Sequence, residues 1–142
     1  CDLRCASMAA SFAVPEVTLG TICGAGGTQR LPRLIGETRA KEMIFTGREI
    51  TAETAREWGL VNGVFTAGSL LEETLNLAEE IARNSPYAVT RAKRSVNGGR
   101  EMLLEEALEW ERSLFGECGE SRDRKEGMTA FLEKRPRVFT GE

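Results

Sequence analysis

One short segment of the chain brings an acid and a run of glycines together. Residues 15–31 read PEVTLGTICGAGGTQRL, with Glu16 directly after an apolar run and Gly24-Ala25-Gly26-Gly27 beginning eight residues later. A carboxylic acid can give or take a proton at a reacting carbon. Backbone N–H groups at a glycine-rich helix start favour negative charge. The pattern therefore indicates proton transfer on a substrate that becomes anionic.

Both parts of this segment also have simpler explanations. A Glu that follows a strand is ordinarily an exposed loop residue. The glycines could form only a tight turn into a helix, where they supply unusual backbone angles. A phosphate-binding loop is a further alternative, but no Gly-Lys-Ser/Thr ending follows, and the G-x-G-x-x-G pattern fails at Gln29.

The composition restricts the possible chemistry. With 142 residues, 41% apolar and 29% charged, the chain has the make-up of about one globular domain. It contains no histidine, which excludes His-based triads, a His general base and the usual zinc sites. A net charge of −3 argues against a broad nucleic-acid surface. The four cysteines form no C-x-x-C pair, which favours a reducing compartment.

The first third of the chain contains two of the three predicted strands. Cys1, Leu3 and Cys5 alternate with charged residues as in a strand, so we expect the chain to be part of a longer protein. A second strand over 10–14 should end at Pro15 and place Glu16 at its exit. A short helix or turn over 29–34, broken by Pro32, and a helix over 35–46 that ends at Gly47 should follow.

The remainder of the chain is predominantly helical in pattern. Capping residues and apolar spacing predict these elements: a helix over 51–58, a strand over 60–65, and helices over 69–82, 85–96, 100–115 and 121–134. The change of pattern predicts a boundary between residues 1–66 and 67–142. No apolar run approaches the roughly 18 residues of a membrane span, and no signal peptide opens the chain.

Several separate blocks resemble one family. They are PEVTLGTICGAGGTQRLPRLIG, KEMIFTG at 41–47, AREWGLV at 55–61 and RKEGMTAFLEKR at 124–135. Together they resemble the enoyl-CoA hydratase/isomerase (crotonase) family, in the family's order and over essentially all 142 residues. The endings CDLR and EKRPRVFTGE look closest to the branch that includes methylglutaconyl-CoA hydratase.

The resemblance implies a fold and an assembly. The fold class is α/β, a crotonase/ClpP-like β-β-α spiral, with residues 1–66 as the last turn of its core. Residues 67–142 would form an all-helical trimerisation segment, so the expected partners are an acyl-CoA and further copies of the chain, as a trimer or a dimer of trimers. No membrane and no nucleic acid are expected as partners.

The resemblance also implies site residues. Glu16 would protonate Cα of the substrate, and the Gly24 amide would hold the catalytic water, while a second glutamate and both oxyanion amides would lie upstream of Cys1. Phe115, Phe131 and Lys134 match positions near the CoA adenine and 3′-phosphate. Core or interface packing is the alternative for both phenylalanines, and a solvated helix end is the alternative for Lys134. No metal and no cofactor are expected, since the CoA thioester is the substrate.

One position departs from the family pattern. Cys23 stands where many relatives have proline, and we interpret it as a small apolar filler rather than a reactive thiol.

The expected activity is hydration of trans-2-enoyl-CoA to 3-hydroxyacyl-CoA, in fatty-acid or branched-chain amino-acid breakdown. The alternatives are a Δ3,Δ2-enoyl-CoA isomerase, which needs only the Pro-Glu carboxylate, and a catalytically inert oligomerisation fragment. The expected location is the cytoplasm in a bacterium and the mitochondrial matrix in a eukaryote.

Overall fold

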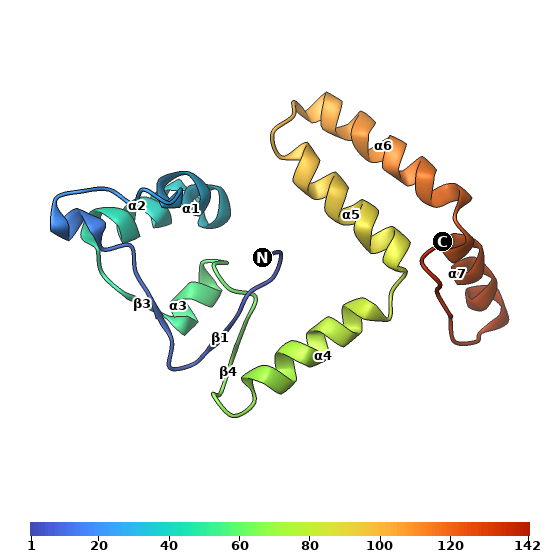
Figure 1. The fold of residues 1–142 in the computed structure, drawn as a ribbon, viewed down its shortest axis with the longest axis horizontal. Coiled ribbons are helices and arrows are strands. Elements are labelled where there is room, and N and C mark those ends of the chain that lie inside the picture. The colour runs from blue at the N-terminus through green and yellow to red at the C-terminus, as the bar shows by residue number, and fades with distance from the viewer. The chain divides into compact units, whose positions relative to one another are not determined.

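The computed structural model describes all residues from Cys1 to Glu142 and divides into two compact units, Cys1–Leu75 and Asn76–Glu142. The division falls inside α4 (Leu70–Ala82). Figure 1 shows strands only in the first unit. The expected separation into a spiral core over 1–66 and a trimerisation segment over 67–142 stays a prediction. None of the helices combines the length and apolar character that crossing a membrane requires.

Two short pairs of strands organise the first unit. Strand β1 (Cys5–Ser7) lies parallel to β4 (Gly63–Phe65). Strand β2 (Ser11–Phe12) pairs antiparallel with β3 (Ile50–Thr51), so that Phe12 lies opposite Ile50. The pairing of β2 with β3 fixes the chain just before Pro15.

The first two helices differ from the sequence prediction at their junction. Helix α1 (Gly27–Ile35) continues through Pro32, which we expected to break it. The missing Pro32 N–H costs one hydrogen bond inside the helix, and the packing of Leu31 and Ile35 into the core offsets this cost. Ile35 therefore ends α1 and does not begin the next helix, because Gly36 separates α1 from α2 (Glu37–Thr46).

The core of the first unit has two neighbouring parts. One consists of buried small side chains from β1, α3 (Ala52–Glu57) and Val61. The other is built around Ile35, Ala40 and Met43, with Phe12 and Val14 packed against it. Phe12 also packs against the first part, and burial of such side chains is the main stabilising term in a small unit. The core thus holds the residues on the N-terminal side of Glu16.

The second unit contains three further helices, α5 (Pro86–Gly99), α6 (Leu104–Glu120) and α7 (Arg122–Glu133). Ser85 and Ser121 cap α5 and α7, accepting hydrogen bonds from the amides of Ala88 and Arg124 at 3.0 Å each. Helices α5 and α6 lie side by side (Figure 1). Their glycine-rich junction permits this close approach, because a Cβ at Gly98 would lie 2.9 Å from the Trp110 Nε1.

Asp123 ties the C-terminal tail to the start of α5. Its side chain is only 2% exposed and accepts hydrogen bonds from the Ser85 hydroxyl at 2.6 Å, the Thr140 amide at 2.8 Å and the Gly141 amide at 3.1 Å. Burial alone would raise the pKa of Asp123. The hydrogen bonds from Ser85 and from the amides of Thr140, Gly141 and Tyr87 outweigh it and hold the pKa below its usual value.

A second carboxylate fixes the beginning of the same tail. Arg135 donates two hydrogen bonds to Glu126, at 2.6 and 2.8 Å, and the Val138 amide donates another at 2.9 Å. These bonds from Arg135 and Val138 lower the pKa of Glu126 to about 2. Glu126 and Glu133 both raise the pKa of Arg135. The residues after α7 are therefore held at two places, although they form no regular element.

The Asp123 network predicts an acid-dependent loss of stability. Because the folded-state pKa lies below the usual value, the ionised form stabilises the fold. This contribution is fully present above the ordinary Asp pKa of about 3.9 and is lost as the pH falls through the lower folded-state pKa. Asp123→Asn should lower Tm at pH 7 by about 5 °C or more, because the charge-assisted bonds are lost.

Thermal unfolding of both proteins between pH 7 and pH 2 measures this effect. The difference in Tm should shrink toward zero at the acid end, where wild-type Asp123 is also neutral. A difference that stays constant over this pH range would contradict the role of the ionised carboxylate.

Candidate functional site

Glu16 lies where the chain leaves β2 and turns back. It begins the short 3-10 helix η1 (Glu16–Leu19), which Pro15 precedes. Thr18 closes the turn twice, because its amide and its hydroxyl both donate to the Pro15 carbonyl, at 2.9 and 2.8 Å. The Thr21 amide donates to the Glu16 carbonyl at 3.2 Å. The backbone around Glu16 is thus fixed by hydrogen bonds on both sides.

The side chain of Glu16 is half-buried. Its Oε2 atom is buried and makes no hydrogen bond within the chain. Buried carboxylate oxygens are nearly always paired, because an unpaired polar atom out of water is costly. An exposed loop residue, the simpler explanation of Glu16, would have a solvated oxygen at this place. Glu16 is therefore not an ordinary solvated loop residue, and its chemical role stays a prediction.

The glycine-rich turn after η1 combines two kinds of glycine. Gly26 has a φ of 88° and precedes α1, and a Cβ at Gly27 would lie 2.8 Å from the buried Cys23 Sγ. Both positions have a structural reason to be glycine, and Cys23 fills the space beside them as an apolar side chain. Gly24 differs, since it is exposed in the turn and a Cβ there would meet nothing within 4 Å.

Apolar side chains near this turn are exposed. Leu19 ends η1 with 81% of its surface exposed, and Ile22, between Glu16 and Gly24, is 66% exposed. Neither residue contributes to the two core clusters of this unit. Two apolar side chains close to Glu16 in the sequence are thus available for contact with another apolar group.

Phe131 and Lys134 line one shared hollow of about 330 Å³ in the second unit. Phe131 is 79% exposed, and Lys134 occupies the left-handed position that ends α7. Arg135 and Arg137 line the same hollow. An exposed aromatic ring beside several cations suits a stacked base and a phosphate. Packing inside the core of this chain is excluded for Phe131 by its exposure.

Phe115 lies in a different hollow from Phe131 and Lys134. It projects from α6 with 75% of its surface exposed, which again excludes core packing within this chain. Together with Arg91 and Glu111 it lines a hollow of about 190 Å³ between α5 and α6. The structure thus brings Phe131 and Lys134 together but places Phe115 separately.

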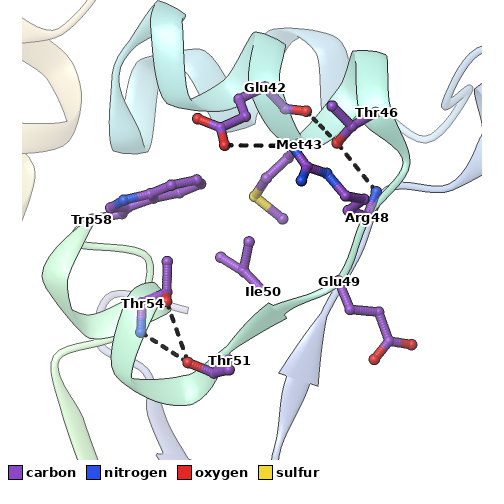
Figure 2. Close-up of a pocket in the computed structure, with 9 residues that line it drawn as sticks. All are labelled: Glu42, Met43, Thr46, Arg48, Glu49, Ile50, Thr51, Thr54 and Trp58. Carbon is purple, nitrogen blue, oxygen red and sulfur yellow. Dashed lines mark hydrogen bonds and ion pairs between the residues drawn. The ribbon is translucent and has the colours of Figure 1, made fainter.

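A further hollow of about 210 Å³ lies in the first unit and contains none of the predicted site residues. Figure 2 shows Met43, Ile50 and Trp58 at its centre and polar side chains around them. The polar groups of this hollow mostly serve local structure. Thr51 Oγ1, for example, accepts from the Thr54 amide at 3.2 Å as the N-cap of α3.

The sequence singled out Glu16 but not the residues that fix its backbone. Thr18 bonds to Pro15 within the turn itself, whereas Gly47 approaches the same turn from about 30 residues further along the chain. Gly47 was recognised only as the end of a helix. A glycine that follows a helix gives no sequence signal for the element packed against it.

Comparison with known proteins identifies the family. A family model described as Enoyl-CoA hydratase/isomerase matches residues 1–142. The chain belongs to this family, which the sequence resemblance indicated.

Individual relatives agree with this assignment. The chain is 48% identical over 139 residues to the mitochondrial enoyl-CoA hydratase of Pongo abelii, covering 98% of this chain and 48% of that relative. It is 44% identical over 141 residues to 2,3-dehydroadipyl-CoA hydratase of Escherichia coli K12, covering 99% of this chain and 55% of that relative. The chain therefore spans about half the length of these curated relatives.

The fold is that of the crotonase family. The crystal structure of an enoyl-CoA hydratase from Bacillus anthracis superposes with a TM-score of 0.96 at 46% sequence identity. The match covers 100% of this chain and 55% of that one. The mixed, helix-rich α/β architecture is thus confirmed. The methylglutaconyl-CoA hydratase branch and the roles of Glu16, Gly24, Phe115, Phe131 and Lys134 stay predictions.

Proposed function

We propose that this chain supplies half of an active site that adds water to a trans-2-enoyl-CoA and gives a 3-hydroxyacyl-CoA. The intact protein would be an enoyl-CoA hydratase, a hydro-lyase. The observation that carries the proposal is the buried Glu16 Oε2, which makes no hydrogen bond within the chain and lies on a turn fixed by backbone bonds. Family membership supplies the class of substrate.

The chemistry requires an acid at this place. As the water oxygen bonds to Cβ of the substrate, electrons move onto the thioester oxygen, and a proton must then reach Cα. Glu16 donates that proton as a general acid. A second glutamate, expected outside this chain, takes a proton from the water, and backbone N–H groups stabilise the negative oxygen.

Gly24 has the separate role of placing the water. Its position in an exposed turn, with open space where a Cβ would be, leaves its backbone accessible to a bound molecule. In the proposed site its N–H donates to the water oxygen and orients a lone pair toward Cβ. No metal and no further cofactor enters this reaction, because the thioester itself accepts the electrons.

The CoA moiety is proposed to bind in the second unit. Phe131 stacks on the adenine and Lys134 pairs with the 3′-phosphate, since both line one hollow with two arginines. Phe115 lies in another hollow, and we propose that it contacts the CoA of a neighbouring copy. Exposed apolar side chains along α6, Leu104 and Leu108 among them, support self-association as a trimer or a dimer of trimers.

We also propose a cellular setting for this activity. Names of relatives include a mitochondrial protein and a protein of Escherichia coli, so the matrix or the bacterial cytoplasm is proposed according to the source. Breakdown of fatty acids or branched-chain amino acids is the proposed pathway, since either produces 2-enoyl-CoA thioesters.

A Δ3,Δ2-enoyl-CoA isomerase is the second candidate. The matching family includes both activities in its description, and an isomerase moves a proton with the Pro-Glu carboxylate alone. Glu16 is compatible with either reaction. A second glutamate in the other half of the site supports hydration, and its absence supports isomerisation.

Replacing the acid tests the proposal directly. In the full-length protein, Glu16→Gln should lower kcat for crotonyl-CoA hydration by about 10²–10⁴-fold, with KM changed less than about twofold, because the proton is transferred in the transition state. Steady-state kinetics measured by loss of enoyl absorbance gives both constants. The matched control is Glu49→Gln, which makes the same change at an exposed carboxylate of the first unit and should leave kcat unaltered. Wild-type turnover by Glu16→Gln would remove Glu16 from the chemistry.

Lys134 should affect binding and not turnover. Lys134→Ala should raise KM for CoA thioesters by about 5–10-fold with kcat nearly intact, since a phosphate contact acts equally in ground and transition states. Lys134→Asn suits the left-handed backbone at this position and should give the same result, which separates charge from backbone strain. Lys125→Ala, on the exposed side of the same helix, is the control. An unchanged KM in both Lys134 variants would exclude this residue from the site.

The chain by itself provides a third test. We expect purified residues 1–142 to show no hydration of crotonyl-CoA, because the second glutamate and the oxyanion amides are expected elsewhere. The full-length protein in the same assay is the positive control. Measurable hydration by the 142 residues would refute the two-part site, whereas inactivity with self-association agrees with an oligomerisation fragment.

A further inference from the structure

Backbone contacts position Glu16, because its buried Oε2 makes no hydrogen bond within the chain. Whatever sets the path of Pro15 therefore also sets the direction of the acid. The contact that does so comes from Gly47, which ends α2 with a φ of 62°. It approaches η1 from about 30 residues further along the chain.

There is no room for a side chain at this approach. A Cβ on Gly47 would lie 2.8 Å from Thr18 Cγ2, 3.4 Å from Pro15 Cα and 3.7 Å from the Pro15 carbonyl oxygen. The first distance is shorter than van der Waals contact allows. Thr18 cannot simply rotate away, because its hydroxyl donates to the Pro15 carbonyl at 2.8 Å. An added methyl group would therefore push the whole turn.

Gly47 cannot retreat from the turn either. Its amide donates to the Met43 carbonyl at 3.0 Å. Its neighbours are fixed by Thr46, whose hydroxyl donates to the Glu42 carbonyl at 2.7 Å and accepts from the Arg48 amide at 3.2 Å. Figure 2 shows the two bonds of Thr46 at the edge of the hollow beside α2. With Gly47 fixed, any adjustment falls on Pro15 and Glu16.

We propose that Gly47 is a positioning residue for the acid: its bare α-carbon supports the Pro15–Thr18 turn and thereby aims Glu16 at Cα of the substrate. The inference rests on the proposed function, since it assumes that the direction of Glu16 matters for proton transfer. According to this proposal, the contact between Gly47 and Thr18 increases the turnover rate as well as contributing to folding.

Kinetics of Gly47→Ala in the full-length protein tests the proposal. A displaced acid is poorly aligned in the transition state, so kcat for crotonyl-CoA should fall by about 10–100-fold while KM stays within about twofold. The control is Gly59→Ala. Gly59 also follows a helix and has a φ of 79°, but a Cβ there meets nothing within 4 Å. It carries the same type of backbone strain without the contact, and its kcat should stay near wild type.

A second-site change should restore activity. Thr18→Ser removes the Cγ2 methyl that an alanine at position 47 would strike and keeps the hydroxyl that bonds to Pro15. The double variant Gly47→Ala with Thr18→Ser should recover most of the lost kcat, to within about threefold of Thr18→Ser alone. General destabilisation by alanine at Gly47 would not be relieved by this change.

Amide hydrogen exchange separates this inference from the proposed function. In Gly47→Ala the peptide over 16–21 should exchange faster than in wild type or Gly59→Ala, because its turn bonds are displaced. Faster exchange with wild-type kcat would overturn the positioning role and leave the hydratase proposal intact. Equal loss of kcat in Gly59→Ala, or no recovery in the double variant, would also overturn it. A wild-type protein with no hydratase activity would instead refute the proposed function.

Discussion

In the first unit, the position of the Glu16 carboxylate depends on the backbone around it, because its Oε2 makes no hydrogen bond within the chain. Most buried acids are fixed by donors to both oxygens, as Asp123 is in the second unit. Glu16 Oε2 has no such donor, so its place depends on the strand before it and the turn after it. The β2–β3 pair, Val14 in the core and the bare backbone of Gly47 each restrict that path. An acid left with an unpaired oxygen can donate its proton to a substrate without first breaking a bond to the protein.

The second unit uses the opposite arrangement. Asp123 and Glu126 are both saturated with donors, and both have a lowered pKa, which makes them structural anions over the neutral range. Their partners include backbone amides of the tail after α7, so that hydrogen bonds fix this irregular segment. The hollow lined by Phe131 and Lys134 is bordered by Arg135, which Glu126 fixes. Carboxylates therefore position the cationic surface in this unit, whereas backbone contacts position the carboxylate in the other.

Local signals in the sequence predicted most helices and their caps. They did not predict contacts between residues that lie far apart in the sequence. Thr51, Ser85 and Ser121 each have the cap geometry expected from their type, because a cap depends on only three or four neighbouring residues. The continuation of α1 through Pro32 was missed, since it depends on core packing of the helix that no local rule contains. Glu16 was singled out by its motif, and its role as the acid stays a prediction. The support of its turn by Gly47 was not predicted, because a glycine at a helix end gives no sign in the sequence that it also packs against another segment.

The exposure of Leu19 and Ile22 bears on how such a site becomes active. Proton transfer to carbon and stabilisation of an anionic oxygen both gain from exclusion of water. This chain buries one oxygen of Glu16 but leaves the apolar side chains on the same turn in solvent. Burying these two side chains would be favourable by about 25 cal/mol for each Å² removed from water. In the proposed hydratase, these two exposed side chains would attract an acyl chain or a covering segment, and their burial would help to exclude water from the acid. Burial of Leu19 and Ile22 would thus stabilise both the closed site and the bound substrate, because both residues lie within a few residues of Glu16.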